Sequence, residues 1–232
     1  MGLFNLFKKN QPDHSNAVTG PYKDSAINLV YNLLFCDNLD LYKSNSEDPY
    51  PYPWNILFSE TSTRSELQGI IDDDNTESRM KILAYRRQSA VGHAPAKREL
   101  LAVIAEVGLD SGLDVLASFR DGTSRYINQA GKMLIWETPD PKSRELTNDF
   151  FVKSQIVVNK IGPWEKGRLP HPAKGKARIT FLVSSDIYFG EGPIGVLFND
   201  PLASPALQCA TQLMKYITEK ALESKPMTNN PA

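Results

Sequence analysis

The sequence predicts an α+β fold in which a single antiparallel sheet is covered by helices and preceded by an N-terminal helical segment. Before residue 92 the apolar residues recur at helical spacing, whereas β-rich runs joined by short turn sequences fill residues 100–136. A helical stretch separates these runs from two or three later strands, and helical spacing returns after residue 204. Because each element must bury its apolar side against another layer, this order predicts one sheet with helices packed on it.

Residues 1–20 form a predicted flexible tip and tether. After Met1, residues 2–9 place four apolar side chains before two lysines, and the following residues are polar without periodicity. The N-myristoylation pattern requires Ser or Thr at the place of Leu6, so it is not met. So few apolar side chains would give at most weak contact with a membrane surface.

Residues 21–92 are predicted to be a helical segment packed on the main domain. Helices are expected over Lys23–Phe35, where Asp24 can cap the start, over Ser62–Ile71 and over Asn75–Ala90. Between them, Asp48–Trp54 carries three alternating prolines, which exclude a helix and favour an extended aromatic strap. We expect its aromatic rings to seal an edge of the core, with an exposed proline-rich ligand as the alternative.

Residues 93–224 are predicted to be the α+β domain, and residues 225–232 a loose tail. Glycine- and asparagine-containing turns join four strands into a meander. Asp140-Pro141 then begins a helix that Gly162-Pro163 ends, and Ser204-Pro205 begins the final helix. The expected strands are Leu100–Val107, Val115–Phe119, Arg125–Asn128, Met133–Trp136, Ala177–Ser184 and, across a turn at Gly190–Gly192, Ile194–Phe198.

Three stretches of the meander carry a resemblance: Leu113–Gly122, Arg125–Asn128 and Gly131–Glu137. Here, and more loosely at Tyr188–Gly192 and in the last helix, the chain resembles a group of bacterial proteins of unknown function. The resemblance implies no activity and no catalytic residue. By the order of its elements alone, the domain is also similar to profilin-like or roadblock-like domains, and such an analogy carries little about function.

Composition and charge place the chain among ordinary soluble cytoplasmic proteins. It has 232 residues and a net charge of −1, so no overall field attracts nucleic acid or an anionic membrane, and nucleic acid is disfavoured as a partner. Cys36 and Cys209 are too few for a disulfide framework. No apolar run approaches the length of a membrane span, and the N-terminus lacks a signal peptide.

Motifs for catalysis, metals and cofactors are missing from the sequence. His14, His93 and His171 lie in loops, and no serine stands in a nucleophile elbow. Cys36 and Cys209 lie in apolar helical contexts that disfavour a thiolate. No zinc pattern or phosphate-binding loop is present, and the acidic run at residues 72–74 is expected to cap a helix. We therefore expect no cofactor, no metal and no catalytic residue.

Charge is strongly segregated along the chain. Residues 37–77 carry a net charge of −8, residues 79–98 carry +6, and residues 160–178 carry +5. Either the acidic segment neutralises the basic ones internally, or the long loop at residues 162–176 faces an anionic ligand. In the second case the candidate ligand-binding residues are Trp164, Lys166, Arg168, His171, Lys174 and Lys176.

These observations favour a non-catalytic interaction or scaffold module that binds a protein partner or a second copy of itself. The alternative is an enzyme or small-ligand-binding protein that recognises an anionic small molecule through residues 162–176. The two hypotheses differ on whether the cations of that loop are free or paired.

Overall fold

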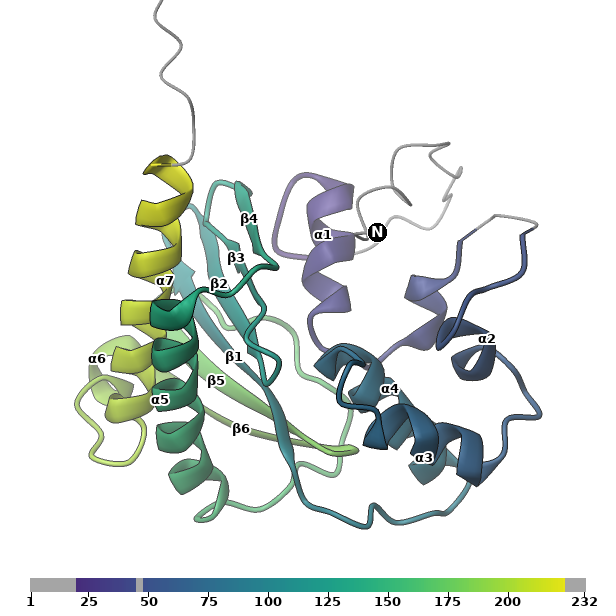
Figure 1. Cartoon of the computed structure of the whole chain (residues 1–232). Coiled ribbons are helices and arrows are strands. Elements are labelled where there is room, and N and C mark those ends of the chain that lie inside the picture. The colour runs from purple at the N-terminus through teal and green to yellow at the C-terminus, as the bar shows by residue number, and fades with distance from the viewer. Residues whose placement is uncertain (1–19, 45–47, 224–232) are drawn as a thin grey trace, which may run out of the picture.

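The computed structural model describes residues 20–44 and 48–223. It has a six-stranded antiparallel sheet between two layers of helices, which confirms the α+β fold (Figure 1). The predicted tip, up to residue 19, and the predicted tail from residue 225 lie outside the described residues. Within the described residues, no helix is both long and apolar enough to cross a membrane.

The sheet has the strand order β4-β3-β2-β1-β5-β6. The first four strands form the predicted meander, and β5 returns to pair with β1 at the centre. Glu106 on β1 lies opposite Val115 on one side and Arg178 on the other. The strands are β1 (Leu100–Leu109), β2 (Gly112–Phe119), β3 (Ser124–Ile127), β4 (Met133–Trp136), β5 (Lys176–Val183) and β6 (Asp186–Pro193).

Two long helices, α5 (Pro141–Val158) and α7 (Ser204–Glu223), cover one face of the sheet (Figure 1). Asp140 caps α5 as predicted, since its carboxylate accepts a hydrogen bond from the Ser143 amide at 2.8 Å. The helices bury one stripe each against alternate residues of the strands. Members of this core include Val103, Phe150, Phe181, Leu213 and Ile217.

The N-terminal helices cover the opposite face (Figure 1). Their apolar side chains share one core with residues of β1, β2 and β3, among them Ile104, Val115 and Phe119. The segment therefore contributes to the same hydrophobic core as the sheet. Its elements are α1 (Ser25–Leu33), the 3-10 helix η2 (Leu39–Tyr42), α2 (Trp54–Leu57), α3 (Arg64–Asp72) and α4 (Ser78–Ala90).

The aromatic strap is not helical until its last residue, where Trp54 begins the short helix α2. The Trp54 ring packs against Phe58 at 5.3 Å and against Tyr42 at 5.4 Å between centroids. Tyr52 is 52% exposed, so it does not seal the core. The strap is thus anchored by Trp54, while one of its tyrosines faces solvent.

Two local predictions are wrong. The segment Gly190–Gly192 lies inside β6, and Ile194–Leu197 forms the short helix α6, where a turn and a strand were expected. The hairpin turns earlier because Ser184 adopts a positive φ of 49°. At residues 72–74, Asp73 closes a turn by accepting a hydrogen bond from the Asn75 amide, and α4 begins only at Ser78.

Candidate functional site

The loop at residues 162–176 crosses the sheet face that α1 covers. At one end the Trp164 amide donates to the Ile187 carbonyl at 2.7 Å, and at the other end Lys176 lies opposite Pro193. Ile187 and Pro193 are six residues apart on β6, a distance of about 20 Å at the rise of an extended strand. The six candidate residues are therefore spread along the sheet and do not surround one small ligand.

Arg168 connects this loop to the N-terminal segment. Its Nε donates to Asp37 Oδ2 at 2.7 Å, and its Nη2 donates to Asn32 Oδ1 at 2.6 Å. The guanidinium also lies over the Phe35 ring, 4.1 Å from the centroid. Because Asp37 belongs to the acidic segment, this contact joins the acidic and basic parts of the chain.

Two further cations of the loop are also paired within the chain. Lys174 lies 2.8 Å from Asp110, and Lys176 lies 3.2 Å from Glu191. The Lys174 and Asp110 side chains line an open pocket of about 370 Å³ beside the turn between β1 and β2. Since the two charges face each other at its wall, the pocket has no cation left over among its lining residues.

The remaining candidates make weaker contacts. Lys166 is exposed, and its ammonium lies 5.7 Å from the centre of the Trp164 ring. Trp164 Nε1 donates to the Gly167 carbonyl at 3.0 Å, and its ring meets Phe189 edge-on. His171 is exposed, with Nδ1 3.3 Å from the Pro172 carbonyl.

Beneath the loop lies a buried ionic network that the sequence analysis missed. Glu106 is completely buried, and its Oε1 accepts a hydrogen bond from the Tyr31 hydroxyl at 2.7 Å. Its other oxygen lies 3.8 Å from Arg178 Nη1. Arg178 in turn donates to Glu191 through Nε at 2.9 Å and to the Pro170 carbonyl at 2.7 Å.

Burial raises the pKa of Glu106, because a carboxylate loses its hydration in the core. The Tyr31 hydrogen bond and the nearby Arg178, Arg168 and His171 side chains oppose that shift. Burial, and after it the charge of Glu106, also raises the pKa of Tyr31. A carboxylate with 0% exposure cannot meet a substrate, so the network's evident role is to fix the loop and α1 to the sheet.

The signal for this network was present in the sequence. Glu106 interrupts the apolar run Leu100–Val107, and Arg178 alternates with apolar residues in the next central strand. A charged residue in the middle of a buried strand needs a partner, and the antiparallel register supplies one.

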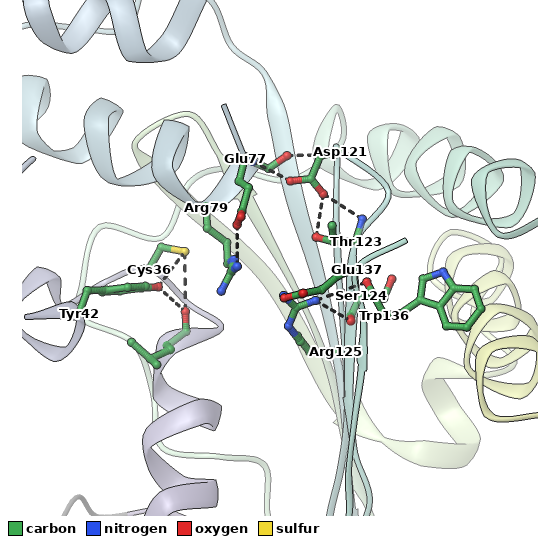
Figure 2. A network of polar contacts seen from close by, with 12 residues as sticks. Cys36, Tyr42, Glu77, Arg79, Asp121, Thr123, Ser124, Arg125, Trp136 and Glu137 are labelled. Atoms are coloured by element: carbon green, nitrogen blue, oxygen red, sulfur yellow. Dashed lines mark hydrogen bonds and ion pairs between the residues drawn. The ribbon is translucent and has the colours of Figure 1, made fainter. Parts of the chain in front are cut away.

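A second polar network joins α4 to the turn between β2 and β3 (Figure 2). The Ser78 amide donates to Asp121 Oδ2 at 2.8 Å, and the Asp121 amide donates to Ser78 Oγ at 3.0 Å. The other Asp121 oxygen accepts from the amide and the hydroxyl of Thr123. These reciprocal bonds hold the start of α4 against the sheet.

The same network contains two buried arginines with half-exposed partners (Figure 2). Arg79 lies 2.6 Å from Glu77, and Arg125 lies 3.0 Å from Glu137. Burial, and after it the charge of Arg79, lowers the pKa of Arg125 to about 10, so Arg125 stays protonated at neutral pH. Turn formation accounts for Asn128, whose side chain accepts from the Lys132 amide at 2.9 Å.

Cys36 is buried, and burial raises the pKa of its thiol to about 11. Burial also raises the pKa of Cys209. Both thiols are therefore protonated at neutral pH and poor nucleophiles. In the part of the chain that the structure describes, no group of three or more His, Cys, Asp or Glu side chains is placed to hold a metal ion.

No family model matches the chain, and no curated protein sequence matches it.

Proposed function

We propose that this chain is a non-catalytic interaction or scaffold module whose partner is another protein or a second copy of itself. The observation that carries the proposal is the ion pair between Arg168 and Asp37 at 2.7 Å. It supports the hypothesis that the acidic segment neutralises the basic loop at Arg168, while Lys174 and Lys176 pair with Asp110 and Glu191 outside that segment. The loop then serves to connect the N-terminal helices to the sheet.

The outer surface of α5 offers apolar contact area for such a role. Val152 and Ile156 are 49% and 48% exposed and lie one turn apart on the helix. Residues four apart share one side of a helix, so the two branched side chains form a short apolar stripe. Val196 on α6 is 60% exposed and adds a further apolar side chain to the surface.

The proposal is tested by removing the loop cations. Phosphate, sulfate and a nucleotide are added at fixed ionic strength to the wild type and to an Arg168→Gln, Lys174→Gln double variant, and the melting temperature is recorded. We expect each anion to shift both proteins by the same increment. An increment that disappears in the double variant would instead establish the loop as an anion site and overturn the proposal.

The partner is addressed by sedimentation velocity over a wide concentration range. Self-association should appear as a concentration-dependent mass, and Val152→Asp with Ile156→Asp should weaken it. Lys153→Gln, on the same helix, is the matched control because it changes an exposed side chain outside the apolar stripe. A mass that stays monomeric at every concentration would restrict the proposal to a different protein partner.

A further inference from the structure

A pocket of about 170 Å³ lies between the β2–β3 turn and α5, away from the loop at residues 162–176. Arg120 and Gly122 line it from the turn, and Arg144, Thr147 and Asn148 line it from the helix. The volume equals that of about five or six water molecules at about 30 Å³ each. It is large enough for a small polar ligand.

Both arginines of this pocket lack a carboxylate partner. Arg144 is exposed, and its guanidinium makes no ion pair or hydrogen bond with any residue in the described ranges, 20–44 and 48–223. Arg120 is also exposed, and its guanidinium lies over the Phe151 ring at 5.4 Å, which leaves its N–H groups free of acidic partners among the same residues. This contrasts with Arg168 and Arg178, which are paired.

A buried hydroxyl at the pocket wall also lacks a partner. Thr147 is 5% exposed, and its Oγ1 makes no hydrogen bond. Buried polar groups in proteins are nearly always hydrogen-bonded, so the Thr147 hydroxyl lacks a partner that water or a bound molecule could supply. The neighbouring Asn148 side chain adds an amide donor to the same wall.

The turn is shaped so that its backbone can approach this site. Gly122 adopts a φ of 90°, and a Cβ there would lie 3.1 Å from Pro139 Cγ and 3.8 Å from Arg144 Nη1. Any larger residue would be strained and would press on Pro139 beside the Arg144 guanidinium.

The acidic groups near the pocket are engaged elsewhere. Asp121 lines the pocket, but three donors from Ser78 and Thr123 occupy its oxygens. On α5, Glu145 pairs with Lys142 at 3.0 Å. The charged lining residues, two arginines and one aspartate, therefore leave one positive charge in excess.

We propose that this pocket binds the phosphate group of a small molecule, either inorganic phosphate or a phosphate monoester. Guanidinium groups match phosphate oxygens with paired N–H donors, and here one reaches in from the turn and one from the helix. The hydroxyl of Thr147 and the amide of Asn148 can meet the remaining oxygens. This inference goes beyond the interaction module, because it adds a small-molecule site, which lies on the same helix as the apolar stripe of Val152 and Ile156.

The test is calorimetric titration of the full chain with inorganic phosphate and with glycerol phosphate at fixed ionic strength, using chloride as the reference salt. We expect saturable binding that Arg120→Gln and Arg144→Gln each weaken at least tenfold, whereas Arg144→Lys weakens it less. Thr147→Val should weaken it a few-fold without lowering the melting temperature in chloride, since it removes a hydroxyl that has no partner. A tighter fit of glycerol phosphate would identify a monoester site, and equal affinities would identify a site for phosphate itself.

Lys153→Gln is the matched control, because it removes one positive charge from the exposed side of the same helix. Its affinity should stay within twofold of the wild type. The proposal is overturned if chloride and phosphate act alike, or if Lys153→Gln weakens binding as much as Arg144→Gln. If phosphate binding is lost in the Arg168→Gln, Lys174→Gln double variant but not in Arg144→Gln, both the pocket proposal and the interaction-module proposal are overturned. If binding is lost in Arg144→Gln alone, the interaction-module proposal is unaffected.

Discussion

Two pairs of arginines lie on opposite faces of the sheet and differ in how their charges are balanced. Arg168 and Arg178 belong to the basic segment of the sequence, yet Asp37, Glu191 and the buried Glu106 neutralise them. Arg120 and Arg144 lie outside any conspicuous charge cluster and face a pocket without a carboxylate partner among the described residues. A run of cations in the sequence is therefore a poor predictor of an anion site, because a cation that is already paired with a carboxylate in the fold is not available to a ligand.

The difference has a consequence for stability as well as for binding. Charges that are paired beneath a loop have already lost their hydration. Removing one partner therefore leaves the other charge buried without compensation, which destabilises the fold. Charges that remain on the surface of a pocket keep their hydration and can be removed at little cost. Substitutions of Arg168 or Arg178 should therefore lower the stability of the fold strongly and change anion binding little. Substitutions of Arg120 or Arg144 should weaken anion binding strongly and change the stability little.

The largest effect is expected from Arg178→Gln. The substitution leaves Glu106 in the core without its cation and removes the donors to Glu191 and to the Pro170 carbonyl. Breaking a buried pair from one side costs about 3–5 kcal/mol of unfolding free energy. Urea unfolding followed by tryptophan fluorescence measures it.

The matched control is Arg120→Gln, which should change the unfolding free energy by less than about 0.5 kcal/mol. Adding Glu106→Gln to Arg178→Gln should recover part of the loss, because no charge then stays buried alone. Equal destabilisation by the two arginine variants would show that the paired Arg178 adds no more to stability than Arg120 does.

A smaller effect is expected from Arg168→Gln. Its ion pair with Asp37 is four-fifths buried on both sides, and the guanidinium also covers the Phe35 ring. Hydrogen bonds to charged groups contribute about 1.5–3 kcal/mol each, and residual solvent screening places the expected loss at the lower end of that range. Asp37→Asn should cost a similar amount, and the double variant should cost less than the two single losses together, as measured by a double-mutant cycle.

Much of the fold could be predicted because it depends on local pattern. The meander strand Met133–Trp136, the Asp140 cap and the long final helix follow from periodicity and turn chemistry, and the structure has all three. The Gly190–Gly192 prediction failed because two glycines read as a turn, although glycine can also occupy an edge strand such as β6. Local chemistry does not tell these two cases apart.

The binding residues were harder to predict, since they depend on contacts between distant segments. Arg168 meets Asp37 across 131 residues of sequence, and Arg120 meets the α5 residue Arg144 at the same pocket across the whole of β3 and β4. The charge pattern offered two alternatives for the loop, internal neutralisation or an anion site, and gave no means to choose between them; the Arg168–Asp37 pair supports the first at that residue alone. It gave no sign of the Arg120 and Arg144 pocket, because two isolated arginines have no pattern.

The pH dependence of unfolding in the Glu106→Gln variant tests the buried network of Glu106, Tyr31 and Arg178 further. Burial raises the pKa of Glu106 above its unfolded value, so the folded chain holds this proton more tightly than the unfolded chain. The carboxyl's contribution to stability is then greatest below its unfolded pKa and is lost as the pH rises through its raised folded pKa. The glutamine does not titrate and still offers an acceptor to the Tyr31 hydroxyl.

We therefore expect the wild type to lose stability relative to Glu106→Gln as the pH is raised from 4 towards neutrality. Denaturant unfolding of both proteins at each pH measures this difference, and titrations elsewhere in the chain cancel. A difference that grows in favour of the wild type would mean that Tyr31, Arg178, Arg168 and His171 together outweigh burial. The buried network around Glu106 would then stabilise the folded chain at neutral pH.

The smallest effect on the unfolding free energy is expected from substitutions at the Arg120 and Arg144 pocket in the absence of phosphate. Arg144→Gln removes an exposed guanidinium without an ion-pair partner among the described residues, and Thr147→Val replaces a buried, unpaired hydroxyl by a methyl group of similar size. Each should change the unfolding free energy by less than about 0.5 kcal/mol in chloride, and Thr147→Val should be neutral or stabilising because it removes a buried polar atom. In saturating phosphate the wild type should gain stability by mass action, about 2.7 kcal/mol at one hundred times the dissociation constant, whereas Arg144→Gln should gain far less. A Thr147→Val variant that is strongly destabilised in chloride would show that the hydroxyl has a partner within the fold. The unpaired hydroxyl would then no longer support the proposal that this pocket binds phosphate.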